Sequence, residues 1–198
     1  MAKVTIGVIG CGNMGAALIK AIKKPLHSGQ ITIYDVDKHK AKYIAGKYKA
    51  KIALSNSDLA KRCDIIILAV KPKDMKGVLR QIKQQLGASK CLISIAAGIR
   101  TSFIEKAAGK RISVIRVMPN MPALVGAGIS AICKGRFAAN KDLAMAKKML
   151  KNIGEVVEIK ESLMNAATAI SGSGPAYFFY LVDPYLFRFN KFLFYIFI

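Results

Sequence analysis

The sequence predicts an α/β fold built around a doubly wound, mostly parallel sheet. Three observations lead to this prediction. Short β-branched apolar runs alternate with segments that carry apolar residues at helical spacing. Residues 65–70 are apolar without interruption, as expected for a strand that helices cover on both faces. A glycine-rich turn joins the first predicted strand to the first predicted helix.

The N-terminal part of the chain predicts a strand–helix–strand unit. Residues 4–9 form a short β-branched run that ends at Gly10, and residues 30–34 form a second run. Between them, residues 13–24 carry apolar side chains at helical spacing, and Pro25 closes the segment. This unit is the first of several.

The same alternation continues to residue 159. Further helices are expected at 38–48, 75–86, 101–107 and 141–150. Further strands are expected at 64–70, 91–96, 112–117, 128–133 and 155–159. The pattern then changes to a helix at 163–169, a loop at 171–175 and a second apolar helix at 176–182, which Pro184 cuts.

The charge of the chain is strongly positive, with 32 Lys and Arg against 11 Asp and Glu and a formal net charge of +21. Such an excess fits either nucleic-acid binding or a solvated lysine-rich surface around a site for an anionic cofactor. The lysines are scattered, with only short clusters such as Lys23-Lys24 and Lys147-Lys148. This pattern favours the solvated surface, so we expect no nucleic-acid partner.

The cysteines have neither metal-ligand nor disulfide spacing. Cys11, Cys63, Cys91 and Cys133 lie far apart, without a CxxC pair or a histidine at ligand spacing. We therefore expect no metal site and small buried thiols, of which Cys11 in the glycine loop could be partly exposed. The N-terminus lacks the features of a signal peptide, so a cytoplasmic location is expected.

Gly10-Cys11-Gly12-Asn13-Met14-Gly15 stands between a strand and a helix, the context of a dinucleotide-binding fingerprint. In a Rossmann fold the first glycine allows the tight turn, the second admits the pyrophosphate, and the third lets helix and strand pack closely. Asp35 follows 20 residues after Gly15, where an acid meets the adenosine ribose. It favours NAD over NADP, a preference that the basic residues Lys38, His39 and Lys40 would soften.

Two further turns lie at the carboxyl ends of predicted strands, the edge at which open α/β sheets bind ligands. Ala69-Val70-Lys71-Pro72 either lines that site or forms an ordinary turn with Lys71 in solvent. Asn120 either hydrogen-bonds a carboxamide or caps the turn that follows it. The spacing alone leaves both pairs of interpretations open.

These motifs together resemble the pyrroline-5-carboxylate reductase family. The resemblance includes the glycine loop, the turn at 69–72 and Arg116-Val117-Met118-Pro119-Asn120. Its most specific part is Ala169-Ile170-Ser171-Gly172-Ser173-Gly174-Pro175-Ala176-Tyr177. It extends from residue 3 to about residue 183, in the order and spacing of the family.

The resemblance implies a reductase of proline biosynthesis that transfers hydride from NADPH or NADH to 1-pyrroline-5-carboxylate and gives L-proline. Because the cofactor supplies the hydride and the protonated imine is electrophilic, no dedicated catalytic residue is expected. The residues that the resemblance assigns to the cofactor are Gly10, Cys11, Gly12, Asn13, Met14, Gly15, Asp35, Ala69, Val70, Lys71, Pro72 and Asn120. Those that it assigns to the substrate are Glu161, Ser171, Gly172, Ser173 and Gly174. A nucleotide-binding module without catalysis is the alternative function.

The resemblance divides the chain into an NAD(P)-binding Rossmann domain at 1–160 and the start of an all-α dimerisation and substrate domain at 161–183. A divergent aromatic tail follows at 184–198. Family members continue instead with helices that build a homo-oligomer, so this chain is expected to be truncated and to differ in assembly. We expect a shifted reading frame at the tail, and cofactor binding without measurable proline formation. The tail is too short and too polar to span a membrane, so no membrane partner is expected.

Overall fold

A computed structural model describes residues 4–23, 31–175, 177–178 and 180–182. The described strands are β1 (Ile6–Ile9), β2 (Ile31–Tyr34), β3 (Lys51–Ile52), β4 (Ile65–Leu68), β5 (Cys91–Ser94), β6 (Ser113–Pro119), β7 (Gly128–Lys134) and β8 (Gly154–Glu158). The described α-helices are α1 (Asn13–Lys23), α2 (Lys38–Tyr48), α3 (Asn56–Arg62), α4 (Met75–Ile82), α5 (Thr101–Ala108), α6 (Asn140–Leu150) and α7 (Met164–Ala167). The expected doubly wound α/β fold is confirmed.

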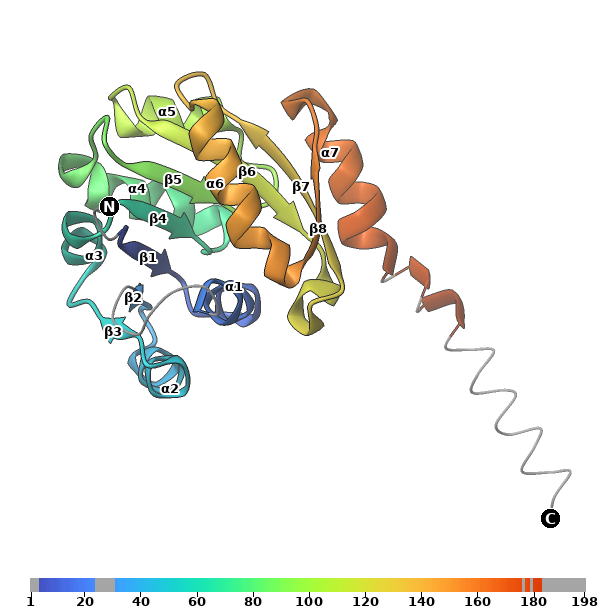
Figure 1. Ribbon diagram of the computed structural model, residues 1–198, viewed down its shortest axis with the longest axis horizontal. Coiled ribbons are helices and arrows are strands. Elements are labelled where there is room, and N and C mark those ends of the chain that lie inside the picture. The colour runs from blue at the N-terminus through green and yellow to red at the C-terminus, as the bar shows by residue number, and fades with distance from the viewer. Residues whose placement is uncertain (1–3, 24–30, 176, 179, 183–198) are drawn as a thin grey trace, which may run out of the picture.

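The strands form one eight-stranded sheet in the order β3-β2-β1-β4-β5-β6-β7-β8 (Figure 1). Strand β1 lies between β2 and β4, and the pairs from β3 to β6 are parallel. The order reverses direction at β1, so the loops that follow β1 and β4 lie side by side at the carboxyl edge of the sheet. This is the switch point at which doubly wound sheets bind ligands. Beyond it, β7 runs antiparallel to β6, and β8 runs parallel to β7.

Helices cover both faces of the sheet (Figure 1). Helices α1, α2 and α6 supply one apolar cluster, in which Leu18, Ile44 and Leu150 pack against the strands. Helices α3, α4 and α5 supply the other cluster, which includes Leu59 and Leu79. Because both faces are buried, the central strands have no polar face. This burial explains why strand β4 is the uninterrupted apolar run Ile65–Leu68.

Two elements, β3 and α3, were not among those expected from the sequence. Strand β3 has two residues, both exposed, so no apolar alternation marks it. Helix α3 has seven residues and is largely polar. Ser55 caps its N-terminus, because the Ser55 side chain accepts a hydrogen bond from the backbone N–H of Asp58 at 3.0 Å. Strand β3 has no apolar run and helix α3 is short and mostly polar, so neither shows a hydrophobic pattern in the sequence.

The prediction of a loop at 171–175 was wrong, because this segment is helical. A turn at Glu161–Leu163 leads into α7, and α7 continues as π-helix from Thr168 to Ser173. Residues 174–175, 177–178 and 180–182 are also helical. The glycine and serine composition favours a loop, but contacts with strand β6, described below, hold the segment. It lies beside the β7–β8 edge of the sheet (Figure 1).

The tail expected at 184–198 lies outside the described residues. Among the residues that the structure describes, no helix has the length and apolar character needed to cross a membrane.

Candidate functional site

The glycine loop connects β1 to α1 at the carboxyl edge of the sheet. Gly10 has a φ of +99°, and a Cβ there would lie 2.5 Å from the carbonyl oxygen of Ala69. A Cβ on Gly15 would overlap the carbonyl oxygen of Gly10. A Cβ on Gly12, in contrast, would meet no atom within 4 Å. The packing of the protein therefore requires glycine at 10 and 15, whereas Gly12 borders open space.

Helix α1 begins beside that open space. The carbonyl of Gly12 accepts the first helical hydrogen bond, from the N–H of Ala16 at 2.8 Å. The first turn holds no acidic side chain, with Asn13 exposed and Met14 half-buried. Amides in a first turn have no acceptor within their own helix, so they carry the partial positive charge of the helix dipole. The start of α1 is therefore suited to an anionic group such as a phosphate.

Asp35 follows β2 directly and lies against the glycine loop. Its Oδ2 accepts a hydrogen bond from the backbone N–H of Cys11 at 2.6 Å. Its Oδ1 accepts one from the N–H of Asp37 at 2.9 Å. The carboxylate is half-buried, and these two amides fix its orientation. A negative charge is thus held beside the glycine loop, as the spacing of Asp35 predicted.

The expectation that Cys11 could be partly exposed was wrong. Cys11 is 2% exposed, because its side chain belongs to the apolar cluster beneath α1. Burial, reinforced by the neighbouring charge of Asp35, raises the pKa of the Cys11 thiol to about 12. The same residue therefore contributes a backbone amide to the loop and a packed side chain to the core. The other three cysteines are also buried, as expected.

The turn at 69–72 lies next to the glycine loop. The N–H of Ala69 donates to the carbonyl of Ile9 at 2.8 Å, which continues the pairing of β4 with β1. Val70 is half-buried, whereas Lys71 and Pro72 are exposed at the start of a short 3₁₀ turn. The structure therefore brings this turn to the same edge as Gly10, with the Lys71 side chain on the surface.

Asn120 directly follows β6 at the same edge and connects two other segments. Its Oδ1 accepts a hydrogen bond from the N–H of Ile129 at 2.9 Å, and its Nδ2 donates to the hydroxyl of Ser171 at 3.2 Å. It makes no capping hydrogen bond to the turn at Met121–Val125. The side chain therefore does not cap the next turn and instead joins the sheet to the helical segment after residue 160.

Glu161 is the most extensively bonded of the expected substrate residues. Its Oε1 accepts from the backbone N–H of Thr101 at 2.7 Å, and its Oε2 accepts from the Thr101 hydroxyl at 2.8 Å. It also forms an ion pair with Arg116 at 3.3 Å. Burial acts to raise the pKa of Glu161, but the hydrogen bonds from Thr101 and the charge of Arg116 outweigh it. The pKa therefore lies below its ordinary value.

Ser171, Gly172, Ser173 and Gly174 lie on the helical segment rather than on a loop, and all four are half-buried. A Cβ on Gly172 would lie 3.2 Å from Cε of Met118, so glycine allows the helix to approach β6 closely. The structure thus brings this segment to Asn120, while Glu161 lies against Arg116 in the middle of β6.

Three residues of this region, Thr101, Arg116 and Asn165, were not expected to be functionally placed. Arg116 is 3% exposed, and its Nη2 donates to Oδ1 of Asn165 at 3.4 Å. The sequence does contain one signal for it. An arginine inside the apolar run of β6, Ser113–Pro119, requires a buried partner. The sequence could not show which carboxylate supplies that partner.

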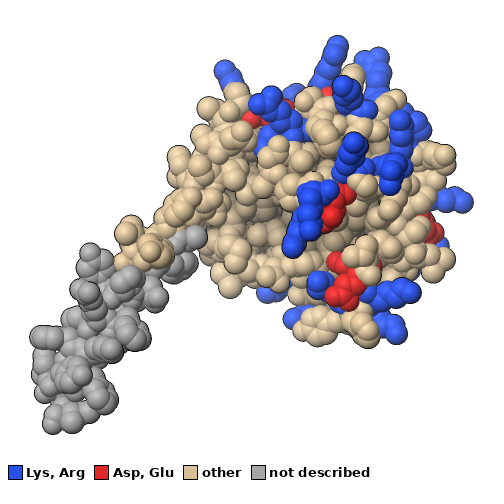
Figure 2. All heavy atoms as spheres, turned by 180° about the vertical axis from the view of Figure 1, so that it is seen from behind, with Lys and Arg blue, Asp and Glu red and all other residues tan. Residues whose placement is uncertain are grey.

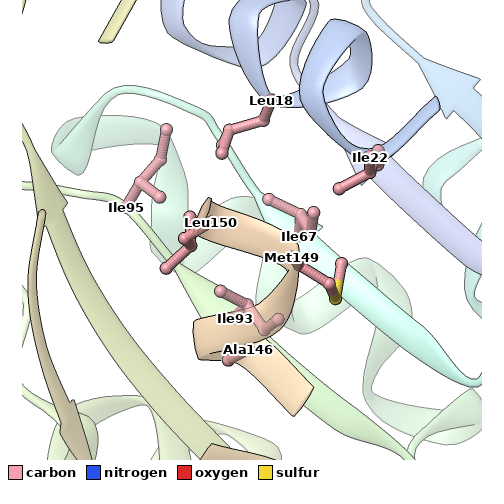
Figure 3. A pocket seen from close by; sticks show the side chains of 8 residues that line it. All are labelled: Leu18, Ile22, Ile67, Ile93, Ile95, Ala146, Met149 and Leu150. Carbon is pink, nitrogen blue, oxygen red and sulfur yellow. The ribbon is translucent and has the colours of Figure 1, made fainter. Parts of the chain in front are cut away.

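Neither of two other features of the described structure offers a site. A cavity of about 10 Å³ lies beneath α1 and α6, lined only by apolar side chains such as Leu18, Ile67 and Met149 (Figure 3). It is too small and too apolar for a ligand, so it is a packing gap. Among the described residues, no group of three His, Cys, Asp or Glu side chains is placed to hold a metal ion.

The surface is basic without one dominant patch on the visible face. Figure 2 shows Lys and Arg side chains spread over the body of the molecule, with few Asp and Glu between them. Some pair locally, as Lys147 does with Glu158 at 2.6 Å. This distribution resembles the solvated lysine-rich surface inferred from the sequence.

Comparison with known proteins gives relatives over both parts of the chain. Residues 5–98 match a family model described as NADP oxidoreductase, coenzyme F420-dependent. Residues 161–186 match a model described as pyrroline-5-carboxylate reductase dimerisation, which reaches slightly beyond the expected end of the resemblance. The chain is 36% identical to the pyrroline-5-carboxylate reductase of Corynebacterium melassecola and 37% identical to that of Methanosarcina acetivorans. It is covered to 90% in both alignments and spans 68% and 67% of these two relatives.

Solved structures give the same result. The pyrroline-5-carboxylate reductase of Coxiella burnetii superposes with a TM-score of 0.88 at 27% identity, over 96% of this chain and 71% of that one. The Plasmodium falciparum enzyme, solved with NADP bound, superposes with a TM-score of 0.85 at 34% identity and the same coverage. Prephenate dehydrogenase of Aquifex aeolicus, at 15% identity and a TM-score of 0.73, shares the fold alone. On this similarity in sequence and fold, the chain belongs to the pyrroline-5-carboxylate reductase family.

Proposed function

We propose that this protein reduces 1-pyrroline-5-carboxylate to L-proline with NADPH or NADH. The single observation that carries the proposal is the glycine loop. Packing accounts for Gly10 and Gly15, and the open space at Gly12, beside the start of α1, is where a pyrophosphate would fit. Family membership supplies the reaction, an NAD(P)H-dependent reduction of a C=N bond.

The residues around the loop fit a dinucleotide. The amides of Gly12, Asn13 and Met14 would hold the pyrophosphate, because the first turn of α1 offers donors without acceptors. Asp35 would accept from the adenosine ribose through the remaining lone pairs of its two oxygens, each of which accepts one backbone N–H. The turn at 69–72 and Asn120 would line the nicotinamide side. When bound, the cofactor supplies the hydride.

At the substrate end, the role of this chain is to hold and orient a cyclic imine that carries a carboxylate. Ser171, Gly172, Ser173 and Gly174 would form this end, next to Asn120. The protonated imine is itself electrophilic, so we assign no acid or base to the step. Positioning, and balancing the charge of the substrate carboxylate, would be the contribution of the protein.

A second copy of the chain is part of the proposal. The match at residues 161–186 is to a dimerisation model. The helical segment there exposes apolar side chains that a partner would cover, namely Ile170, Tyr177, Phe178, Tyr180 and Leu181. We propose a homo-oligomer formed through this segment. The cytoplasmic location expected from the sequence belongs to the same proposal.

The test combines two measurements on the purified chain. Cofactor binding is followed by the fluorescence of NADPH or NADH, and turnover by cofactor oxidation together with formation of proline. We expect saturable binding and oxidation that requires 1-pyrroline-5-carboxylate, and such turnover would contradict the expectation from the sequence that this chain forms no measurable proline. Binding without turnover would leave a nucleotide-binding module and contradict the reductase proposal. Absence of both would contradict the assignment of the glycine loop as well.

A further inference from the structure

The side chain of Glu161 connects segments that are far apart in the sequence. Thr101, which occupies both of its oxygens, is 60 residues away, and Arg116 is 45 residues away. All of these contacts belong to the α/β part of the chain, whereas Glu161 begins the helical segment. The carboxylate therefore attaches the start of that segment to the sheet.

The first of these contacts completes helix α5. Arg100, at the N-cap position of α5, makes no side-chain capping hydrogen bond. The first amide of the helix, that of Thr101, donates to Glu161 instead. A carboxylate at this position also interacts favourably with the positive end of the helix dipole. Glu161 thus acts as a cap for a helix to which it does not belong.

The second contact neutralises a buried charge. Arg116 is 3% exposed, and an arginine stays protonated in proteins. In the described part of the chain, Glu161 is the carboxylate that pairs with it. Removing one partner of such a pair leaves the other buried and uncompensated. Arg116 also donates to Asn165, four residues after Glu161, so two points of the helical segment are fixed to one strand residue.

The contacts with β6 continue in order along the helical segment. Arg116 contacts residues 161 and 165, and Asn120 contacts Ser171. Four strand residues span about 13 Å, and ten residues of helix rise about 15 Å. The two lengths agree, so the segment runs beside β6 toward the carboxyl edge of the sheet. If the helical segment left Glu161 in a different direction, Ser171 would therefore move away from Asn120.

We propose that Glu161 is a positioning residue that locks the helical segment to α5 and β6 and thereby places Ser171 at the substrate end. It acts through Thr101 and Arg116, without touching the substrate. This differs from the substrate contact that the family resemblance assigned to it. The effect on catalysis rests on the proposed reductase function, whereas the lock itself does not.

The first test compares the effect of Glu161 on kcat/KM for the substrate with its effect on the Kd for the cofactor. In Glu161→Ala we expect kcat/KM for 1-pyrroline-5-carboxylate to fall about tenfold or more, because displacement of a positioned group by an ångström is costly. The Kd for NADPH should change by less than about twofold, since the glycine loop is untouched. Glu161→Gln keeps an oxygen for Thr101 but loses the charge, so its kcat/KM should lie between those of the wild type and Glu161→Ala. Glu158→Gln is the matched control, because exposed Glu158 pairs only with Lys147 in the described structure.

A double-mutant cycle distinguishes positioning from direct contact. Thr101→Val removes the hydroxyl that Glu161 binds, at a position that is 4% exposed. If Glu161 acts through Thr101, this variant lowers kcat/KM as well, and the double variant loses less than the product of the two single effects. If Glu161 instead binds the substrate, Thr101→Val leaves kcat/KM unchanged, which would overturn the proposal.

Amide hydrogen exchange tests the lock without any turnover. In Glu161→Ala we expect amides of residues 164–173 to exchange about tenfold faster or more, while those of α1 keep their rates. Should the wild-type chain show no turnover, the reductase proposal fails and exchange alone decides about the lock. Unchanged exchange at 164–173 would overturn it. Should Glu161→Ala not fold, Glu161→Gln and Thr101→Val carry the same comparison.

Discussion

Gly12→Ala is the sharpest test of the glycine loop, because the structure predicts a small effect on stability and a large effect on cofactor binding. A Cβ at this position meets no protein atom within 4 Å. The methyl group would therefore not strain the fold. It would instead occupy the space that we assign to the cofactor pyrophosphate.

The two magnitudes follow from the contacts. Gly12 is the residue before α1, and alanine is a poorer N-cap than glycine, so we expect a loss of about 0.5–1 kcal/mol in the free energy of unfolding. A methyl group between backbone and phosphate would break one charge-assisted hydrogen bond, about 1.5–3 kcal/mol. The Kd for NADPH or NADH should rise by about 10–150-fold.

Cofactor fluorescence measures the Kd, and the chain contains no tryptophan to interfere. Chemical denaturation measures the stability. Gly46→Ala is the matched control, since Gly46 lies exposed in α2 and its added Cβ also meets no atom. It should stabilise the chain by about 0.5–1 kcal/mol and leave the Kd unchanged. An unchanged Kd in Gly12→Ala would refute the assignment of the open space to the cofactor.

Four further predictions concern specificity, the core, acid stability and thiol reactivity. Asp35→Ser should raise the ratio of kcat/KM for NADPH to that for NADH by about tenfold or more, because it removes a fixed negative charge from the ribose side. Leu79→Ala should lower the free energy of unfolding by about 2–5 kcal/mol, since Leu79 lies on the fully buried face of α4. The pKa of Glu161 is lower in the folded state than its ordinary value. The stability that the Glu161 carboxylate contributes is therefore present above its unfolded pKa and is lost as the pH falls through its folded pKa. Because Glu161→Gln lacks this carboxylate, its free energy of unfolding should fall less on acidification than that of the wild type. Thiol reagents should leave the four buried cysteines of the native chain unmodified and react with all of them after unfolding.

Each of these predictions has a result that contradicts it. An unchanged cofactor ratio in Asp35→Ser would show that the carboxylate does not face the ribose. Leu54→Ala, at a position that is 87% exposed, should be close to neutral; a loss equal to that of Leu79→Ala would contradict the assigned core. Parallel pH–stability curves for Glu161→Gln and wild type would remove the lowered pKa as a source of stability. Rapid modification of native thiols would contradict their burial.

The sequence determined the elements whose signal is local. The apolar run of β4 and the helical period of α2 specified these elements, because their side chains repeat with the period of the structure they adopt. The glycine loop and Asp35 were located by spacing, because a turn, a helix start and a strand end impose fixed distances along the chain. These patterns were enough to predict the fold class and the cofactor side of the candidate site.

Only the tertiary structure decided the remaining features. Residues 171–175 have the composition of a loop, yet contact with Met118 and Asn120 holds them in a helix. Whether Glu161 meets a substrate or a protein partner depends on which groups arrive from 45 and 60 residues away. Such pairing leaves no periodic trace in the sequence, since a polar side chain looks the same whether its partner is water or a buried arginine. The local patterns therefore fixed the elements, and long-range packing decided what their polar side chains contact.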